Sequence, residues 1–182
     1  AIVDLGCAPG GWLQVSSIRT KLGHGKARLV GIDLLDTEGV VGADIFTGDM
    51  TDPEMLETVR LATGGAADGV LSDMAADTTG HRATDHLRTT ALLEAALDFA
   101  IDVLNKNGFF LAKCFRGGAE RSLLDVMQRN FKMVRHVKPA ASRAESVESY
   151  VLATGFHGSG RVEDIAADIV AGRRDADGTL IM

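Results

Sequence analysis

The feature that most limits how this sequence can fold is a repeated alternation between short apolar runs and longer segments with helical periodicity. The apolar runs end at glycine, aspartate or proline, which predicts buried strands. The segments between them repeat apolar residues every three or four positions, which predicts helices. Strands are expected at residues 1–6, 27–35, 68–75, 108–115, 132–139 and 148–156, and helices at 11–22, 53–62, 84–107 and 119–131.

This order of elements predicts an α/β fold. Strands that are apolar throughout are typical of a mostly parallel sheet covered by helices on both faces. Only the loop at residues 140–146 separates the last two strands. That loop is too short for a parallel crossover, so these strands are expected to form an antiparallel hairpin. The longest helix is expected to have its N-cap at Thr84 and to end just before Gly108.

The size of the chain predicts one globular domain. It has 182 residues, of which 46% are hydrophobic, enough to bury one core. The two cysteines, Cys7 and Cys114, are too few for a disulfide framework or a zinc site, so we expect no metal and a reducing, cytoplasmic location. No apolar run approaches the roughly 18 residues that would span a bilayer, so no membrane partner is expected.

Charge is unevenly distributed along the chain. The net charge of -6 argues against a nucleic-acid partner, because phosphate contacts need lysine and arginine. Residues 101–150, however, carry nine basic side chains against five acidic ones. This excess indicates either an RNA-binding surface or an ordinary solvated face. The basic residues are Lys106, Lys113, Arg116, Arg121, Arg129, Lys132, Arg135, Lys138 and Arg143.

A glycine-rich turn lies between the first strand and the first helix, in the sequence DLGCAPGGWLQ at residues 4–14. Glycines at this position allow a tight turn and the close approach of a ligand. Asp33 ends the second strand, where dinucleotide-binding folds hold ribose hydroxyls. The spacing is not G-x-G-x-x-G and the turn lacks the lysine of a P-loop, which disfavours NAD and ATP.

Acidic residues follow successive strand ends and favour a cationic nucleoside. Carboxylates would repel the phosphates of a dinucleotide and attract a sulfonium and an amino group. These features predict S-adenosylmethionine as the cofactor. The acidic residues are Asp4, Asp33, Asp49 and Asp73.

The motifs together resemble the FtsJ/RrmJ family of RNA 2′-O-ribose methyltransferases. The likeness runs from DLGCAPGGWLQ through GIDLLDTEGVVGADIFTGDMTD, GVLSDMAADTTGHRATDH and GFFLAKCFRGG to KPAASRAESVESYVLATGF, and covers residues 1–156. It implies a Rossmann-like, S-adenosylmethionine-dependent methyltransferase fold, with a mostly parallel seven-stranded sheet that ends in an antiparallel hairpin. Residues 157–182 are expected to form a weakly helical or disordered tail.

The resemblance also implies an activity. Bacterial members of the family methylate a uridine 2′-hydroxyl in 23S ribosomal RNA of the large subunit, and related members act on tRNA or on mRNA caps. We therefore expect an RNA methyltransferase that works as a monomer. Two alternatives stay open: an RNA- or partner-binding domain that has lost turnover, and methylation of tRNA or of a small molecule on the same fold.

The family's catalytic group resembles a Lys-Asp-Lys-Glu tetrad, and Asp73, Lys113 and Glu148 match three of its members. Glu145 lies three residues before Glu148, and the spacing to YVLATG favours Glu148. Lys113 is expected to aid deprotonation of the hydroxyl or to stabilise the developing alkoxide. The family correspondence places the cofactor against Gly10, Trp12, Asp33, Asp49 and Asp73.

Two departures from the family pattern stand out. Ala76 occupies a position where the pattern has proline, which leaves the following loop less restrained. The first lysine of the tetrad belongs upstream of DLG, whereas this sequence starts at Ala1. We therefore expect that lysine on a preceding segment that the sequence lacks.

Overall fold

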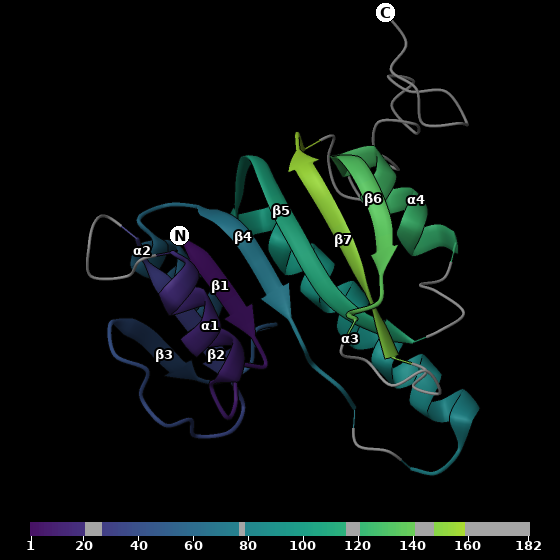
Figure 1. Ribbon diagram of the computed structural model, residues 1–182, viewed down its shortest axis with the longest axis horizontal. Coiled ribbons are helices and arrows are strands. Elements are labelled where there is room, and N and C mark those ends of the chain that lie inside the picture. The colour runs from purple at the N-terminus through teal and green to yellow at the C-terminus, as the bar shows by residue number, and fades with distance from the viewer. Residues whose placement is uncertain (21–26, 77–78, 116–120, 141–147, 159–182) are drawn as a thin grey trace, which may run out of the picture.

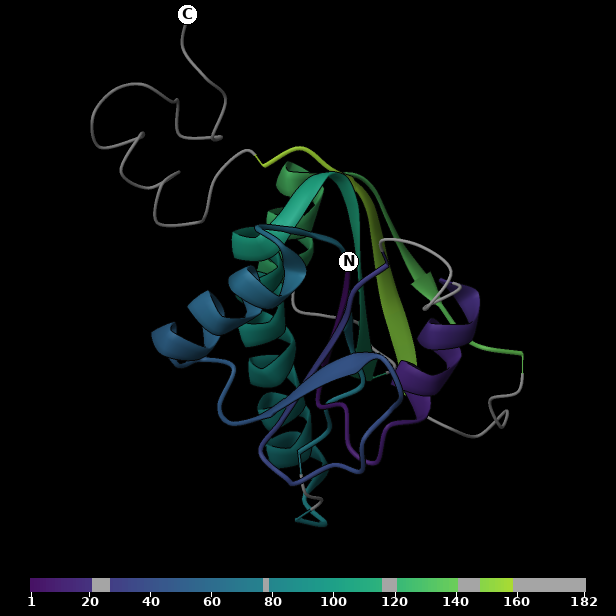
Figure 2. The same cartoon turned by 90° about the vertical axis from the view of Figure 1, so that its left-hand side faces the viewer.

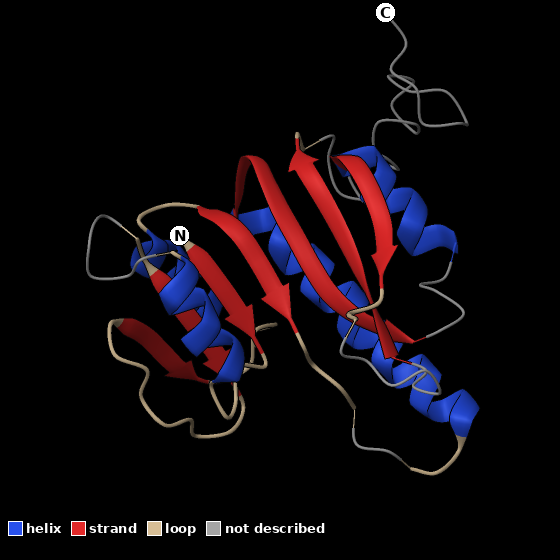
Figure 3. Cartoon of the chain, viewed as in Figure 1, coloured by secondary structure: helices blue, strands red, loops and turns tan. Residues whose placement is uncertain are grey.

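The computed structural model describes residues 1–20, 27–76, 79–115, 121–140 and 148–158. Within these residues a seven-stranded sheet carries four helices (Figures 1 and 3). In chain order the elements are β1 (Ile2–Leu5), α1 (Gly11–Arg19), β2 (Leu29–Asp33), β3 (Ala43–Thr47), α2 (Pro53–Thr63), β4 (Ala67–Ser72), α3 (Arg82–Val103), β5 (Leu104–Phe115), α4 (Arg121–Asn130), β6 (Phe131–Val137) and β7 (Glu148–Phe156).

The sheet has the strand order β3-β2-β1-β4-β5-β7-β6. Helix α1 covers one face, and α2, α3 and α4 cover the other (Figure 2). Because β1, β2 and β4 lie between these layers, almost all of their residues are buried. The edge strands β3 and β6 keep exposed residues along their length. The predicted α/β fold, mostly parallel with helices on both faces, is confirmed.

Strand β7 is antiparallel to both of its neighbours, β5 and β6. The chain therefore makes the expected hairpin from β6 to β7, but β7 lies inside the sheet, between β5 and the edge strand β6. Its register pairs Lys113 of β5 with Tyr150, and Val137 of β6 with the same Tyr150. This pairing brings the end of β5 next to the start of β7.

The residue pattern missed β3, which only the family resemblance implied by requiring a seventh strand. This strand is short and only partly buried at the edge of the sheet, so its sequence lacks the continuous apolar run of a central strand.

The expected limits of the long helix were wrong. His81 is the N-cap of α3 in place of Thr84, and the helix ends at Val103, well before Gly108. The reason is that Leu104 already pairs with Ala67 of β4, so the chain enters β5 directly. The residues that follow form an irregular stretch before the ladder resumes at Phe109, and Asn107 has a φ of 67° within it.

The core forms two clusters, one on each face of the sheet. The larger one joins the central strands to α2, α3 and α4 through residues such as Val3, Val59 and Phe110. The smaller one places Leu13 of α1 against Cys7 and Leu29. No helix among the described residues is long and apolar enough to cross a bilayer. The tail expected at 157–182 lies almost entirely outside the described residues.

Gly31 of β2 provides a test of the packing beneath α1. A Cβ atom there would lie 2.8 Å from both the Cys7 Sγ and the Leu13 Cδ1 atoms. Gly31→Ala should therefore lower the free energy of unfolding by about 1–3 kcal/mol, as overpacking of a core usually does. Urea unfolding followed by circular dichroism measures this change. Gly39→Ala is the matched control, because a Cβ at Gly39 meets nothing within 4 Å. Equal stability of the two variants would contradict the described packing.

Candidate functional site

A pocket of about 460 Å³ opens at the carboxyl ends of the central strands. It lies beside the neighbouring strands β1 and β4. The strands that follow β1 in the chain are added on one side of this pair, and those that follow β4 are added on the other side. In open α/β sheets ligands bind at such a switch point. The lining residues are Gly6, Ala8, Ile32, Asp33, Leu34, Leu35, Gly48, Asp49, Met50, Thr51, Asp73, Met74, Ala75, Leu92 and Ala95.

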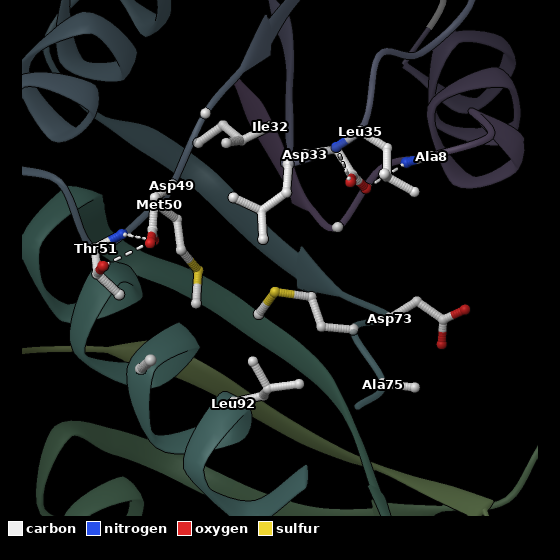
Figure 4. Close-up of a pocket in the computed structure, with 15 residues that line it drawn as sticks. Ala8, Ile32, Asp33, Leu35, Asp49, Met50, Thr51, Asp73, Ala75 and Leu92 are labelled. Atoms are coloured by element: carbon white, nitrogen blue, oxygen red, sulfur yellow. Dashed lines mark hydrogen bonds between the residues drawn. The ribbon is translucent and has the colours of Figure 1, made fainter. Parts of the chain in front are cut away.

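Asp33 is held rigidly at the end of β2 by two backbone amides. Its Oδ2 accepts a hydrogen bond from the Ala8 amide at 2.8 Å, and its Oδ1 accepts one from the Leu35 amide at 2.8 Å (Figure 4). Each carboxylate oxygen has a second lone pair available for another donor. Asp33 can therefore accept hydrogen bonds from vicinal hydroxyls of a ribose while its own position stays fixed.

Asp49 stands on the opposite wall, after β3 (Figure 4). Its Oδ1 accepts hydrogen bonds from the Thr51 amide at 2.8 Å and from the Thr51 hydroxyl at 2.7 Å. These two bonds, the backbone one first, lower the pKa of the Asp49 carboxyl group. Asp49 is therefore an ionised acceptor that can bind an exocyclic amine or another cationic donor.

Apolar side chains line the pocket between the two carboxylates. Ile32, Met50 and Leu92 point into this space in Figure 4, and Met74 contributes a second thioether. Methionine adapts to irregular apolar surfaces and makes favourable contacts with aromatic rings. The two methionines were not predicted, although each directly follows a predicted acidic residue, Asp49 or Asp73. Together these walls fit a flat, apolar ring such as a nucleobase.

A second cluster adjoins the pocket at Asp73. The Lys113 Nζ lies 3.2 Å from Asp73 Oδ1 and 3.6 Å from Glu148 Oε1. The Lys113 side chain is only 11% exposed, so these ion pairs are partly shielded from water. The structure thus brings together the three side chains that the sequence predicted as catalytic. Glu145, the alternative to Glu148, lies outside the described residues.

Tyr150 is a member of this cluster that the sequence analysis missed. Its hydroxyl donates a hydrogen bond to Asp73 Oδ1 at 2.8 Å, the same oxygen that pairs with Lys113. Burial is the main cause that raises the pKa of the Tyr150 hydroxyl, so it remains a donor near neutral pH. The alternation of strand residues could have revealed it, since Tyr150 lies two positions after Glu148 and shares its face.

The turn before α1 places the other two predicted cofactor residues. Gly10 is the N-cap of α1 and has a φ of 108°, which favours glycine. Trp12 follows in the first turn, and its ring centre lies 5.6 Å from that of Tyr150. Gly10 and Trp12 do not line the pocket described above, whereas Asp33, Asp49 and Asp73 do. Their contact with a cofactor stays a prediction.

Two residues of the basic segment, Arg135 and Lys138, lie on the side of the cluster formed by Asp73, Lys113, Glu148 and Tyr150. Val137 of β6 pairs with Tyr150 of β7, so these two residues share one face of the sheet. Arg135 lies two positions before Val137 and therefore lies on the same face. Lys138 follows at the carboxyl end of β6. Two strands, β5 and β7, separate β6 from β4 and the pocket. Arg116 and Arg143 lie outside the described residues.

Comparison with known proteins gives consistent results. Residues 1–156 match the family described as FtsJ-like methyltransferase. "Ribosomal RNA large subunit methyltransferase E" of Mesorhizobium japonicum is 49% identical over 186 residues, covering 97% of this chain and 70% of that protein. The protein of the same name from Gluconobacter oxydans is 54% identical over 155 residues, covering 85% of this chain and 56% of that protein.

A solved structure described as a ribosomal RNA methyltransferase from Plasmodium falciparum has a TM-score of 0.76 at 26% identity and covers 86% of each chain. The chain spans 56% to 70% of the length of the two bacterial relatives. The family match covers every described strand and helix, from β1 to β7. The chain therefore belongs to the FtsJ-like methyltransferase family.

Proposed function

We propose that this protein transfers a methyl group from S-adenosylmethionine to a ribose 2′-hydroxyl of RNA, a uridine of 23S ribosomal RNA in the large subunit. The observation that carries the proposal is the position of Asp73. It lines the pocket and also accepts contacts from Lys113 and Tyr150. The methyl donor in the pocket and the acceptor hydroxyl at Lys113 would thus both lie next to the Asp73 carboxylate.

The residues of the pocket fit S-adenosylmethionine better than a phosphate-bearing cofactor. Three aspartates line the pocket, and no lysine or arginine among the described residues does. A dinucleotide would face carboxylates where it needs donors, whereas a cationic nucleoside is attracted to them. Asp33 would hold the ribose, Asp49 would lie near the adenine, and the apolar walls would hold the ring. When bound, S-adenosylmethionine supplies an electrophilic methyl group on a sulfonium.

The catalytic cluster would act on the acceptor. A ribose hydroxyl is a weak nucleophile, so its oxygen needs stabilisation as negative charge develops. Asp73 and Glu148 hold the Lys113 ammonium by ion pairs at 3.2 and 3.6 Å. We therefore assign Lys113 to stabilising the developing alkoxide, and Asp73 and Glu148 to orienting Lys113.

Ribosomal RNA as the substrate is supported by the relatives. The two bacterial proteins at 49% and 54% identity are both named for methylation of large-subunit ribosomal RNA. Arg135 and Lys138, next to the strand that carries Tyr150, could contact RNA phosphates and position the ribose. A cytoplasmic location fits such a substrate.

Substitution of Asp33 tests the cofactor. Asp33→Ala removes an acceptor fixed by two backbone amides, so it should weaken S-adenosylmethionine binding by about tenfold or more. Isothermal titration calorimetry measures this change. Asp44→Asn, on the exposed edge strand β3 and outside the pocket lining, is the control and should bind normally. NADH should not bind. Comparable binding of NADH, or unchanged affinity in Asp33→Ala, would exclude the assignment.

Substitution of Lys113 tests the catalytic cluster. Lys113→Ala should lower methyl transfer by roughly 10²–10⁴-fold, the usual loss for a group that assists proton transfer or stabilises charge. Affinity for S-adenosylmethionine should stay within about threefold, since Lys113 does not line the pocket. The assay is incorporation of tritiated methyl groups into undermethylated large ribosomal subunits. A Lys113→Ala variant with the wild-type rate would refute the mechanism.

The basic residues of β6 test the RNA surface. Changing Arg135 and Lys138 together to alanine should weaken RNA binding and reduce the slope of log affinity against log salt by roughly one to two. The control is Lys106→Ala, because Lys106 is exposed near the amino end of β5, whereas Lys113 lies near the carboxyl end of that strand. Binding measured by fluorescence anisotropy at several salt concentrations decides the matter. An identical slope in the double variant would make these residues an ordinary solvated face.

A further inference from the structure

The Asp4 carboxyl group is a buried acid for which the catalytic scheme above has no role. Asp4 is 1% exposed, and neither of its oxygens has a hydrogen-bond partner among the described residues. A buried carboxylate without a donor is costly when it is ionised. An acid in this position therefore either carries a proton or has a compensating positive charge nearby.

The strand register shows where this carboxyl group points. Asp4 pairs with Gly31 of β2, and paired residues of neighbouring strands project to the same face of a sheet. A Cβ at Gly31 would point toward Cys7 and Leu13 of the α1 layer. Asp4 therefore points beneath the glycine-rich turn, on the α1 face, two residues before the pocket residue Gly6.

The charges around Asp4 are mostly negative. Burial, then the charge of Asp73 and then that of Asp33 raise the pKa of Asp4 to about 7. The Cys7 thiol stays neutral, because burial raises its pKa to about 11. The other titratable groups of the site are Asp49 after β3, Lys113 on β5, and Glu148 and Tyr150 on β7. Helix α1, which packs over this face of the sheet, carries Arg19 in its last turn.

Lys113, the cation described in the site, is already engaged. It is paired with Asp73 and Glu148. A bound sulfonium would add a positive charge to a poorly solvated region, where charge interactions are strong. The demethylated product has a neutral thioether at the same position and would add none.

Building on the proposed donor, we propose that Asp4 distinguishes S-adenosylmethionine from its product by changing its own charge. Below neutral pH it carries a proton in the empty pocket, releases that proton to solvent when the sulfonium binds, and takes a proton back once methyl transfer has left a neutral thioether. Asp4 thus favours retention of the donor and release of the product. It acts through charge and needs no direct contact with the reacting atoms.

The pH dependence follows from linkage. A cation that favours ionised Asp4 must displace a proton below pH 7, so its affinity rises with pH and levels off above about 7. From pH 5.5 to pH 7.0 the affinity for S-adenosylmethionine should increase roughly tenfold or more. S-adenosylhomocysteine should change by less than about threefold. The amino group of each ligand stays charged across this range, since such groups titrate near pH 8.

Calorimetry in two buffers of different ionisation enthalpy tests the proposal directly. At pH 7.0 binding of S-adenosylmethionine to the wild-type protein should release about half a proton, and S-adenosylhomocysteine should release much less. Asp4→Asn keeps the shape of the side chain but cannot ionise. It should abolish the proton release and remove most of the difference in affinity between the two ligands. Asp44→Asn, the same change on β3, should behave as wild type.

Three results would overturn the proposal: no proton release by the wild-type protein, equal pH dependence for the two ligands, or undiminished proton release in Asp4→Asn. If that variant fails to fold, the two-buffer measurement on the wild-type protein still decides. Failure of both ligands to bind would instead refute the proposed donor site, and the role of Asp4 with it.

Discussion

The backbone pairing between β5 and β7 is the constraint on which the candidate site depends. Because β7 runs antiparallel to β5, the start of β7 lies beside the end of β5. Residues far apart in the sequence therefore meet at the carboxyl ends of the parallel strands. The pairing of Lys113 with Tyr150 puts a cation and a phenol side by side, and the two-residue period of β7 adds Glu148 on the same face. A slip of one residue would turn Glu148 and Tyr150 to the opposite face.

Charge balance is the second constraint. Four acids, Asp4, Asp33, Asp49 and Asp73, lie at or near the ends of neighbouring strands, and their mutual repulsion works against folding of the empty protein. Backbone amides stabilise Asp33 and Thr51 stabilises Asp49, while Lys113 and Tyr150 stabilise Asp73. Asp4 has no such partner among the described residues and carries the raised pKa. The proposed cationic ligand would offset the negative charge that the described residues leave unpaired.

Much of this arrangement could be predicted from the sequence. The apolar runs of the central strands, the helical periodicity between them and the glycine-rich turn predicted the order of elements, and the short connection before Glu148 predicted the hairpin. Strand β3 escaped detection because an edge strand needs no continuous apolar run. The C-terminal end of α3 was misplaced because pairing of Leu104 with β4 overrode a helical pattern that continued past Val103. Tyr150 was missed because its role depends on a partner 77 positions away in the chain, Asp73.

Asp73 connects the two halves of the site. A single oxygen of this carboxylate meets the Lys113 ammonium and the Tyr150 hydroxyl, while the residue itself lines the pocket next to Met74. Charge at Asp73 also contributes to the raised pKa of Asp4. A positive charge in the pocket would therefore act on both carboxylates. In the proposed mechanism, binding of the methyl donor and activation of the acceptor hydroxyl would be coupled through this one side chain, because charge interactions are strong in low-dielectric surroundings.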